Sequence, residues 1–143
     1  LFIRYGKVFG FLDPRKHLPV EAYHASRLCG AVSADCGSCV EAEINLAKNA
    51  GLSDELINRI LAQDFSTLSD EIVAVIKLST AVTNFQDAPE AREKIIEYYG
   101  EKGLIELSFA MNGAALLPGI KRAMGYATSC NLEILKRVPH GKV

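Results

Sequence analysis

The apolar residues of this chain recur at a helical spacing along most of its length. Between residues 70 and 85 they form a stripe with a period of about 3.6 residues, which is typical of an amphipathic helix. Further helices are expected at 20–32, from 33 or 35 to 50, and at 54–63, 89–99, 104–117 and 120–136. No alternating pattern of any length predicts a β-strand, and residues 1–18 are expected to form an extended arm. The pattern therefore predicts an all-α fold, a single-domain bundle of six or seven helices over 1–143.

Several of the expected helix ends carry residues that start or stop helices. The sequence Leu-Ser-Asp-Glu occurs at 52–55 and again at 68–71. In each copy the serine can cap a helix whose first turn carries two acidic side chains, which the helix dipole favours. Gly100 and Gly103 are expected to flank a turn, and the Pro-Gly pair at 118–119 predicts another interruption.

Composition and charge narrow the classes of function. The 143 residues carry 16 basic and 17 acidic side chains, dispersed along the chain, so no nucleic-acid surface is expected. The most apolar stretch, 104–119, contains Glu106, Asn112 and Pro118, which favours a buried helix over a membrane span. The N-terminal segment lacks a secretory pattern, so a cytoplasmic location with reduced cysteines is expected.

Two of the four cysteines, Cys36 and Cys39, form a Cys-x-x-Cys motif at the expected start of a helix. Residues three apart share a helix face, so the two sulfurs can meet within one turn. The unpaired N–H groups and the dipole at a helix start stabilise a thiolate over a thiol. A thiolate beside a second thiol can reduce a peroxide, since one sulfur becomes a sulfenic acid and the other condenses with it to a disulfide. Position alone favours Cys36, which is nearer the helix start, as the thiolate.

His24 and Glu43 are the candidates for moving the thiol proton. Glu43 follows Cys39 by four residues on the same helix face, and His24 lies on the preceding helix. If the two helices pack as an antiparallel hairpin, the imidazole can accept a thiol proton while the carboxylate orients it. The predicted catalytic set is therefore Cys36, Cys39, His24 and Glu43, with no cofactor and no metal.

The spacing His-x11-Cys-x2-Cys-x3-Glu, followed by INLAKNAGLSDELINRIL, resembles the alkylhydroperoxidase D-like branch of the carboxymuconolactone decarboxylase family. The resemblance covers about residues 20–127. In that family the motif is Glu-x11-Cys-x2-Cys-x3-His, so His24 and Glu43 are exchanged between the two helices here. The exchange either keeps the relay with its proton path reversed or marks the loss of the relay.

The resemblance implies an alkylhydroperoxidase D-like helical fold and the activity of a thiol-dependent hydroperoxide reductase. It also implies a small hydroperoxide as substrate, an external dithiol protein as reductant, and a homo-oligomer built from trimers, with no membrane partner. By the family's roles Cys39 attacks the peroxide and Cys36 resolves the sulfenic acid. This assignment is the reverse of the one that position in the helix favours.

Two other functions stay open. A lactone decarboxylase or isomerase, as elsewhere in the same superfamily, needs acid–base groups and no cysteine pair. A non-catalytic helical module could instead hold zinc with His24, Cys29, Cys36 and Cys39, although His24 and Cys29 are five residues apart and point in different directions. Cys29 and Cys130 are expected to be buried as small apolar residues. Stoichiometric zinc in the purified protein would support the structural module.

Overall fold

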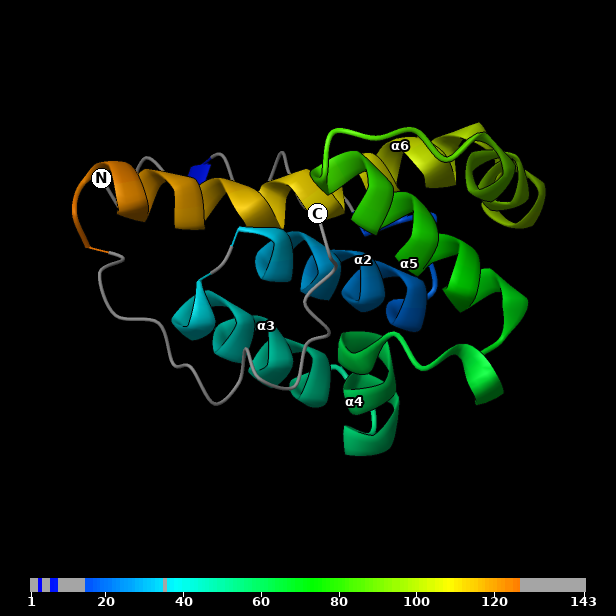
Figure 1. The fold of residues 1–143 in the computed structure, drawn as a ribbon, viewed down its shortest axis with the longest axis horizontal. Helices are drawn as coiled ribbons and strands as arrows, with labels where there is room; N and C mark the ends of the chain where they lie inside the picture. The colour runs from blue at the N-terminus through cyan, green and yellow to red at the C-terminus, as the bar shows by residue number, and fades with distance from the viewer. Residues whose placement is uncertain (1–2, 4–5, 8–14, 35, 127–143) are drawn as a thin grey trace.

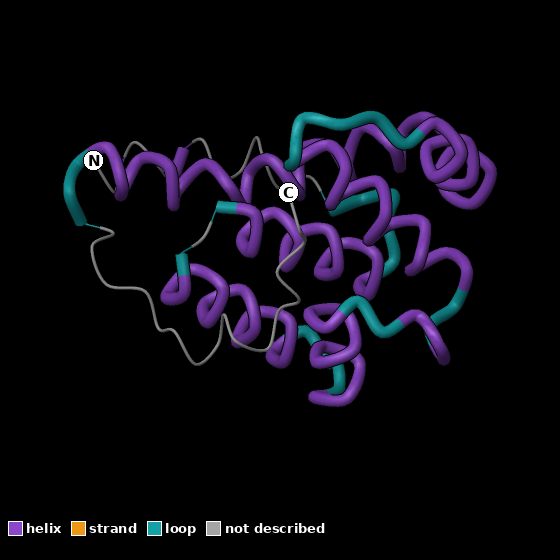
Figure 2. The backbone as a smooth tube through the Cα atoms, in the orientation of Figure 1, coloured by secondary structure: helices purple, strands orange, loops and turns teal. Residues whose placement is uncertain are grey.

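A computed structural model of the chain describes residues 3, 6–7, 15–34 and 36–126. The described residues contain helices and no strand, so the all-α prediction is confirmed for them. From residue 15 onward, the described part of the chain contains five α-helices and one short 3₁₀ turn: α2 (Val20–Ser33), α3 (Gly37–Asn49), α4 (Asp54–Ala62), η1 (Phe65–Thr67), α5 (Asp70–Thr83) and α6 (Pro89–Ala123). Figure 2 shows these helices joined by short loops.

The central helix of the bundle is α2, which lies between α6 on one side and α3 on the other (Figure 1). Nearly all of its side chains from Ala22 to Ala31 are buried. The helix α2 has neighbours on several faces. Its small residues allow these neighbours to pack closely, and its large residues bury apolar surface. The helices α5 and α4 complete the core around it.

The helix α6 agrees with the sequence-based prediction at one expected interruption and differs at the other. The interruption expected near residues 100–103 is present at Gly100, where two helical parts meet at a kink. The second part continues past residue 117 into the beginning of the helix expected at 120–136. Gly100 has φ 70° and ψ 178°, a left-handed conformation that glycine adopts without steric cost, and the helix changes direction there (Figure 1). Pro118 is buried and lies inside the helix, so the interruption expected at 118–119 is absent. The remainder of the last predicted helix, 127–136, lies outside the described residues.

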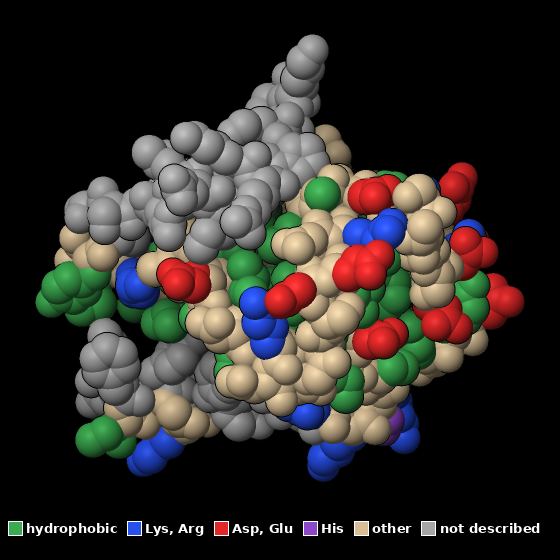
Figure 3. Space-filling view, turned by 90° about the horizontal axis from the view of Figure 1, so that it is seen from below, with side chains coloured by type: hydrophobic (Ala, Val, Ile, Leu, Met, Phe, Trp, Pro, Cys, Tyr) green, Lys and Arg blue, Asp and Glu red, His purple; other side chains and the backbone are tan. Residues whose placement is uncertain are grey.

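The length and composition of α6 would also allow it to cross a membrane. However, 44% of its most apolar 18-residue window is buried inside the fold, and it packs on α2 and α5. This part of α6 therefore buries one side against the fold and exposes the other. Charged side chains of both signs are scattered among apolar ones on the face shown in Figure 3.

The capping predictions are confirmed at two helices. Ser53 Oγ accepts a hydrogen bond from Leu56 N at 3.2 Å, and Ser69 Oγ accepts one from Ile72 N at 3.4 Å. Each serine therefore satisfies one N–H group that the first helical turn leaves unpaired. The same two helices carry an Asp-Glu pair in their first turns.

The segment before α2 is held by a buried carboxylate. Glu106 of α6 is 2% exposed, and its oxygens accept hydrogen bonds from Lys16 N (3.0 and 3.1 Å) and His17 N (2.8 Å). These bonds explain why an acidic side chain is tolerated in the apolar part of α6. Ahead of residue 15, the described residues Ile3, Gly6 and Lys7 are helical, whereas the sequence favoured an extended arm over 1–18.

Gly30 marks the closest approach of α2 to α6. A Cβ atom at this position would overlap the carbonyl oxygen of Met111. We expect Gly30→Ala to lower the free energy of unfolding by about 2 kcal/mol, because the two helix backbones must move apart. Urea titration followed by circular dichroism measures this loss. The control is Gly119→Ala, where a Cβ meets no atom within 4 Å, and where stability should stay equal or rise by up to about 1 kcal/mol. Equal stability of both variants would contradict the close approach.

Candidate functional site at the start of α3

The Cys-x-x-Cys motif lies at the first turn of α3, as predicted. Cys36 is the N-cap residue (φ −123°, ψ 95°) and Cys39 is the third helical residue. The helix begins later than the Ser33 or Asp35 expected from the sequence. The backbone oxygen of Cys36 accepts hydrogen bonds from the N–H groups of Cys39 (2.9 Å) and Val40 (3.0 Å), which closes the first turn and places both sulfurs on one face.

The two sulfurs are brought together in a buried position. Cys36 Sγ lies 2.8 Å from Cys39 Sγ, close enough for one thiol to donate a hydrogen bond to the other. Cys36 is 3% exposed and Cys39 is 8% exposed, and both are free cysteines. Ser38 Oγ, on the exposed residue between them, lies 3.5 Å from Cys36 Sγ. The pair can therefore pass between a dithiol and a disulfide with little movement of the helix.

The two thiols differ in pKa because their local environments differ. Burial raises the pKa of Cys36, but hydrogen bonds with Cys39 and Ser38, together with the positive charge of Lys121, outweigh this and lower the pKa overall. Burial and the neighbouring Cys36 sulfur raise the pKa of Cys39 to about 11. The local environment therefore favours the thiolate at Cys36 over the thiolate at Cys39.

Two basic residues near the end of α6 complete the site. Lys121 Nζ lies 3.3 Å from Ser38 Oγ and 3.9 Å from Cys39 Sγ. The neighbouring Arg122 donates through Nη2 to the backbone oxygen of Ala34 at 2.7 Å. Figure 1 shows that this end of α6 lies on the same side of the molecule as the turn between α2 and α3.

Glu43 is held by Arg27, a residue that the sequence did not single out. Arg27 Nη2 lies 2.6 Å from Glu43 Oε1, and Arg27 Nε lies 2.8 Å from Glu43 Oε2, so the ion pair is bidentate. Both side chains are buried, with 4% and 10% exposed. Arg27 Nη1 also donates to the hydroxyl oxygen of Tyr23 at 3.3 Å. The pKa of Arg27 is raised because the bonds and charge of Glu43 outweigh burial, which alone would lower it.

His24 is buried on α2, with its ring edge-on to that of Tyr23 at a centroid distance of 5.1 Å. The Arg27–Glu43 ion pair joins α2 to α3 across the hairpin. The relay itself stays a prediction.

The possible metal ligands do not gather in the part of the chain that the structure describes. No group of three or more His, Cys, Asp or Glu side chains there is arranged to hold an ion. Cys29 is half-buried, and burial raises its pKa to about 12, although a hydrogen bond with the Thr80 side chain acts in the opposite direction. Cys29 thus behaves as the packed small residue that was expected. Cys130 lies outside the described residues.

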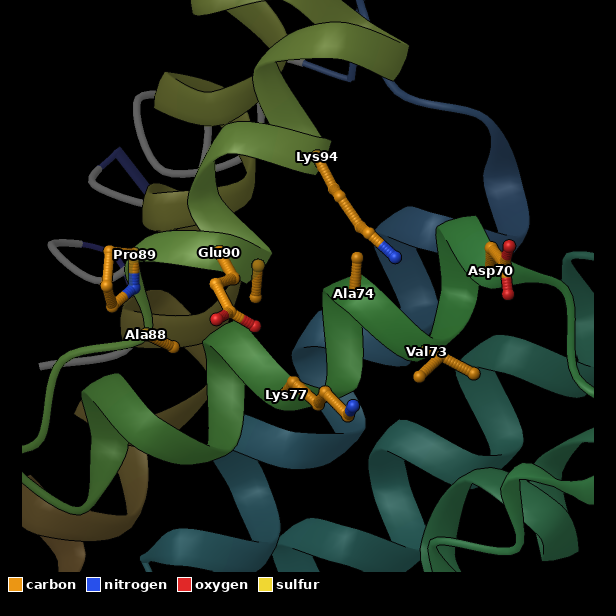
Figure 4. A pocket seen from close by; sticks show the side chains of 9 residues that line it. Asp70, Val73, Ala74, Lys77, Ala88, Pro89, Glu90 and Lys94 are labelled. Carbon is orange, nitrogen blue, oxygen red and sulfur yellow. The ribbon is translucent and has the colours of Figure 1, made fainter.

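A cavity of about 340 Å³ lies elsewhere, between α5 and the start of α6. Figure 4 shows Asp70, Val73, Ala74 and Lys77 of α5 facing Glu90 and Lys94 of α6 across it. Its lining contains no cysteine or histidine, so it is separate from the dithiol site.

Two residues of the site, Arg27 and Lys121, were not predicted from the sequence, which contains a recognisable signal for only the first. Arg27 could have been noticed, because a charged residue inside the apolar run from Ala25 to Ala31 requires a buried partner. Lys121 carried no such signal, since it is 82 residues from Cys39 and follows an expected helix break. Lys121 lies near the sulfurs only because of where the fold places the end of α6.

The order of thiol reactivity follows from these pKa differences. We expect limiting iodoacetamide at pH 7 to label Cys36 first, because alkylation requires the thiolate and the Cys36 pKa is lowered. Cys39 and Cys29 should be labelled more slowly than Cys36, because their pKa values are raised to about 11 and about 12. Peptide mass spectrometry measures the order, and the urea-unfolded chain, with all cysteines equally reactive, is the control. Faster labelling of Cys39 in the folded protein would contradict this charge distribution.

Comparison with known proteins finds no matching family model, no matching curated protein and no matching solved structure. The resemblance to the alkylhydroperoxidase D-like branch therefore stays a prediction. A function can be inferred only from the geometry of the dithiol site.

Proposed function

We propose that the protein is a thiol-dependent hydroperoxide reductase that uses Cys36 and Cys39 and is recycled by an external dithiol protein. The observation that carries the proposal is the buried pair of sulfurs 2.8 Å apart at the start of α3, with unequal acidities. A low-pKa thiolate beside a protonated thiol is the arrangement that two-step peroxide reduction requires.

In the proposed reaction the Cys36 thiolate attacks one peroxide oxygen of ROOH and the O–O bond breaks. The oxygen that leaves takes a proton from the Cys39 thiol, so ROH is released and Cys36 becomes a sulfenic acid. The Cys39 thiolate then attacks the Cys36 sulfur, and the departing hydroxide is protonated to water as the disulfide forms. The external dithiol returns both cysteines to thiols by two exchange steps and is itself oxidised.

This sequence of steps assigns the attack to Cys36, whereas the family resemblance assigns it to Cys39. The charge distribution supports Cys36, because its pKa is lowered while that of Cys39 is raised to about 11. A protonated Cys39 is also suited to supply the proton for the leaving oxygen. His24, as the group that accepts the thiol proton, and Glu43, as the carboxylate that orients the imidazole, are kept in the proposal. A trimer-based homo-oligomer also remains part of the proposal.

The test is hydroperoxide consumption by the reduced protein with excess dithiol present. Turnover above the dithiol background, together with a Cys36–Cys39 disulfide in protein oxidised without dithiol, supports the proposal. The control is protein whose cysteines have been alkylated before the assay. A disulfide that forms without any peroxide turnover would indicate disulfide exchange instead, and the absence of both would refute a redox function.

A further inference from the structure

We propose that Lys121 is a further catalytic group of the dithiol site. Its ammonium stabilises the thiolate charge of the Cys36–Cys39 pair and so increases the amount of reactive thiolate at neutral pH. The inference rests on the proposed function for its biological role. The effect of Lys121 on thiolate formation can be measured without any peroxide.

The position of Lys121 supports this role. Its Nζ atom lies 3.9 Å from Cys39 Sγ and 3.3 Å from Ser38 Oγ, and Ser38 Oγ is in turn 3.5 Å from Cys36 Sγ. A basic group of α6 is therefore connected to both sulfurs of α3, one directly and one through the serine hydroxyl. Because the cysteines are buried, the interaction between the ammonium and the thiolate is less screened than it would be in water.

The contact is held in place by the fold. The adjacent Arg122 bonds the backbone oxygen of Ala34 at 2.7 Å, which attaches the end of α6 to the turn that precedes Cys36. Arg122 thus fixes the helix end while Lys121 reaches the sulfurs. Among the described residues, Lys121 is the charged side chain that lowers the pKa of both thiols. Asp35, which precedes Cys36, lies outside the described residues.

The ammonium would act at two points of the cycle. It stabilises the thiolate that attacks the peroxide, and it stabilises the thiolate that is released when the external dithiol opens the disulfide. In the disulfide neither sulfur is charged, so this stabilisation applies to the reduced state alone. Removing the charge should therefore shift the dithiol–disulfide equilibrium toward the disulfide.

The test compares Lys121→Met and Lys121→Gln with the charge-retaining Lys121→Arg. The pH dependence of Cys36 alkylation is measured by peptide mass spectrometry, with helix content checked by circular dichroism. We expect the two uncharged variants to raise the alkylation midpoint by about one pH unit, equivalent to about tenfold less thiolate below the midpoint. Lys121→Arg should retain most of the wild-type midpoint. The matched control is Lys102→Met, the same charge change at an exposed position of the same helix.

A second readout is the dithiol–disulfide equilibrium in a glutathione buffer at a pH above both alkylation midpoints, where the uncharged variants should favour the disulfide by about tenfold. An unchanged midpoint in both uncharged variants would overturn the inference, as would an equal shift in Lys102→Met. If the wild type lacks hydroperoxide turnover but the uncharged variants still raise the midpoint, then the proposed function fails and the role of Lys121 in thiolate formation stands.

Discussion

Replacing Glu43 by Gln should lower the free energy of unfolding by about 3–5 kcal/mol, the largest loss of stability expected from a single substitution in this protein. Glu43 neutralises Arg27 through two hydrogen bonds, and the two side chains are only 10% and 4% exposed. The amide would remove the negative charge that these two bonds place beside the buried guanidinium. The loss is measured by urea titration, with the slope of the transition used to check that unfolding remains two-state.

The control for this prediction is an exposed ion pair of the same length. Lys48 Nζ lies 2.6 Å from Asp54 Oδ1, but these side chains are 46% and 71% exposed, so Asp54→Asn should cost at most about 1 kcal/mol. The double variant Arg27→Met with Glu43→Leu should recover much of the stability, because it removes both charges and keeps apolar volume. Comparable losses in Glu43→Gln and Asp54→Asn would show that the Arg27–Glu43 pair is not buried in solution.

Cys36→Ser should reduce hydroperoxide turnover to the background given by the dithiol alone, the largest expected effect on activity. The serine hydroxyl is not ionised at neutral pH and cannot form the sulfenic acid, so the first step is lost. Peroxide consumption in excess dithiol measures the effect. The fold should be retained, since serine is close to cysteine in size and Cys36 makes no side-chain capping bond.

Cys39→Ser distinguishes the roles of the two sulfurs. This variant should consume about one peroxide per chain and stop at a sulfenic acid on Cys36, because no resolving thiol is present. A sulfenic-acid trapping reagent followed by peptide mass spectrometry locates the modified residue. A sulfenic acid trapped on Cys39 in the Cys36→Ser variant, and none on Cys36, would instead support the roles that the family resemblance implies.

The helix boundaries show which structural features short stretches of sequence can predict. The caps at Ser53 and Ser69 are present as expected, because a capping bond joins residues three apart and depends on nothing distant. Of the two interruptions expected in this region, the one near Gly100 is present, because the backbone leaves the helical conformation there. The one at 118–119 is absent, because the helix continues through Pro118. A proline makes a helix weaker at its position but does not by itself end it, so this outcome is not encoded locally.

The features of the candidate site also fall into those that local sequence predicts and those that the tertiary structure sets. The sequence by itself determined that Cys36 and Cys39 share a helix start, since i and i+3 spacing on a helix brings the side chains together. Only the tertiary structure decided that Arg27 holds Glu43 and that Lys121 reaches the sulfurs. These contacts depend on helix register and on the path of α6, which many weak packing interactions set together and no local pattern encodes.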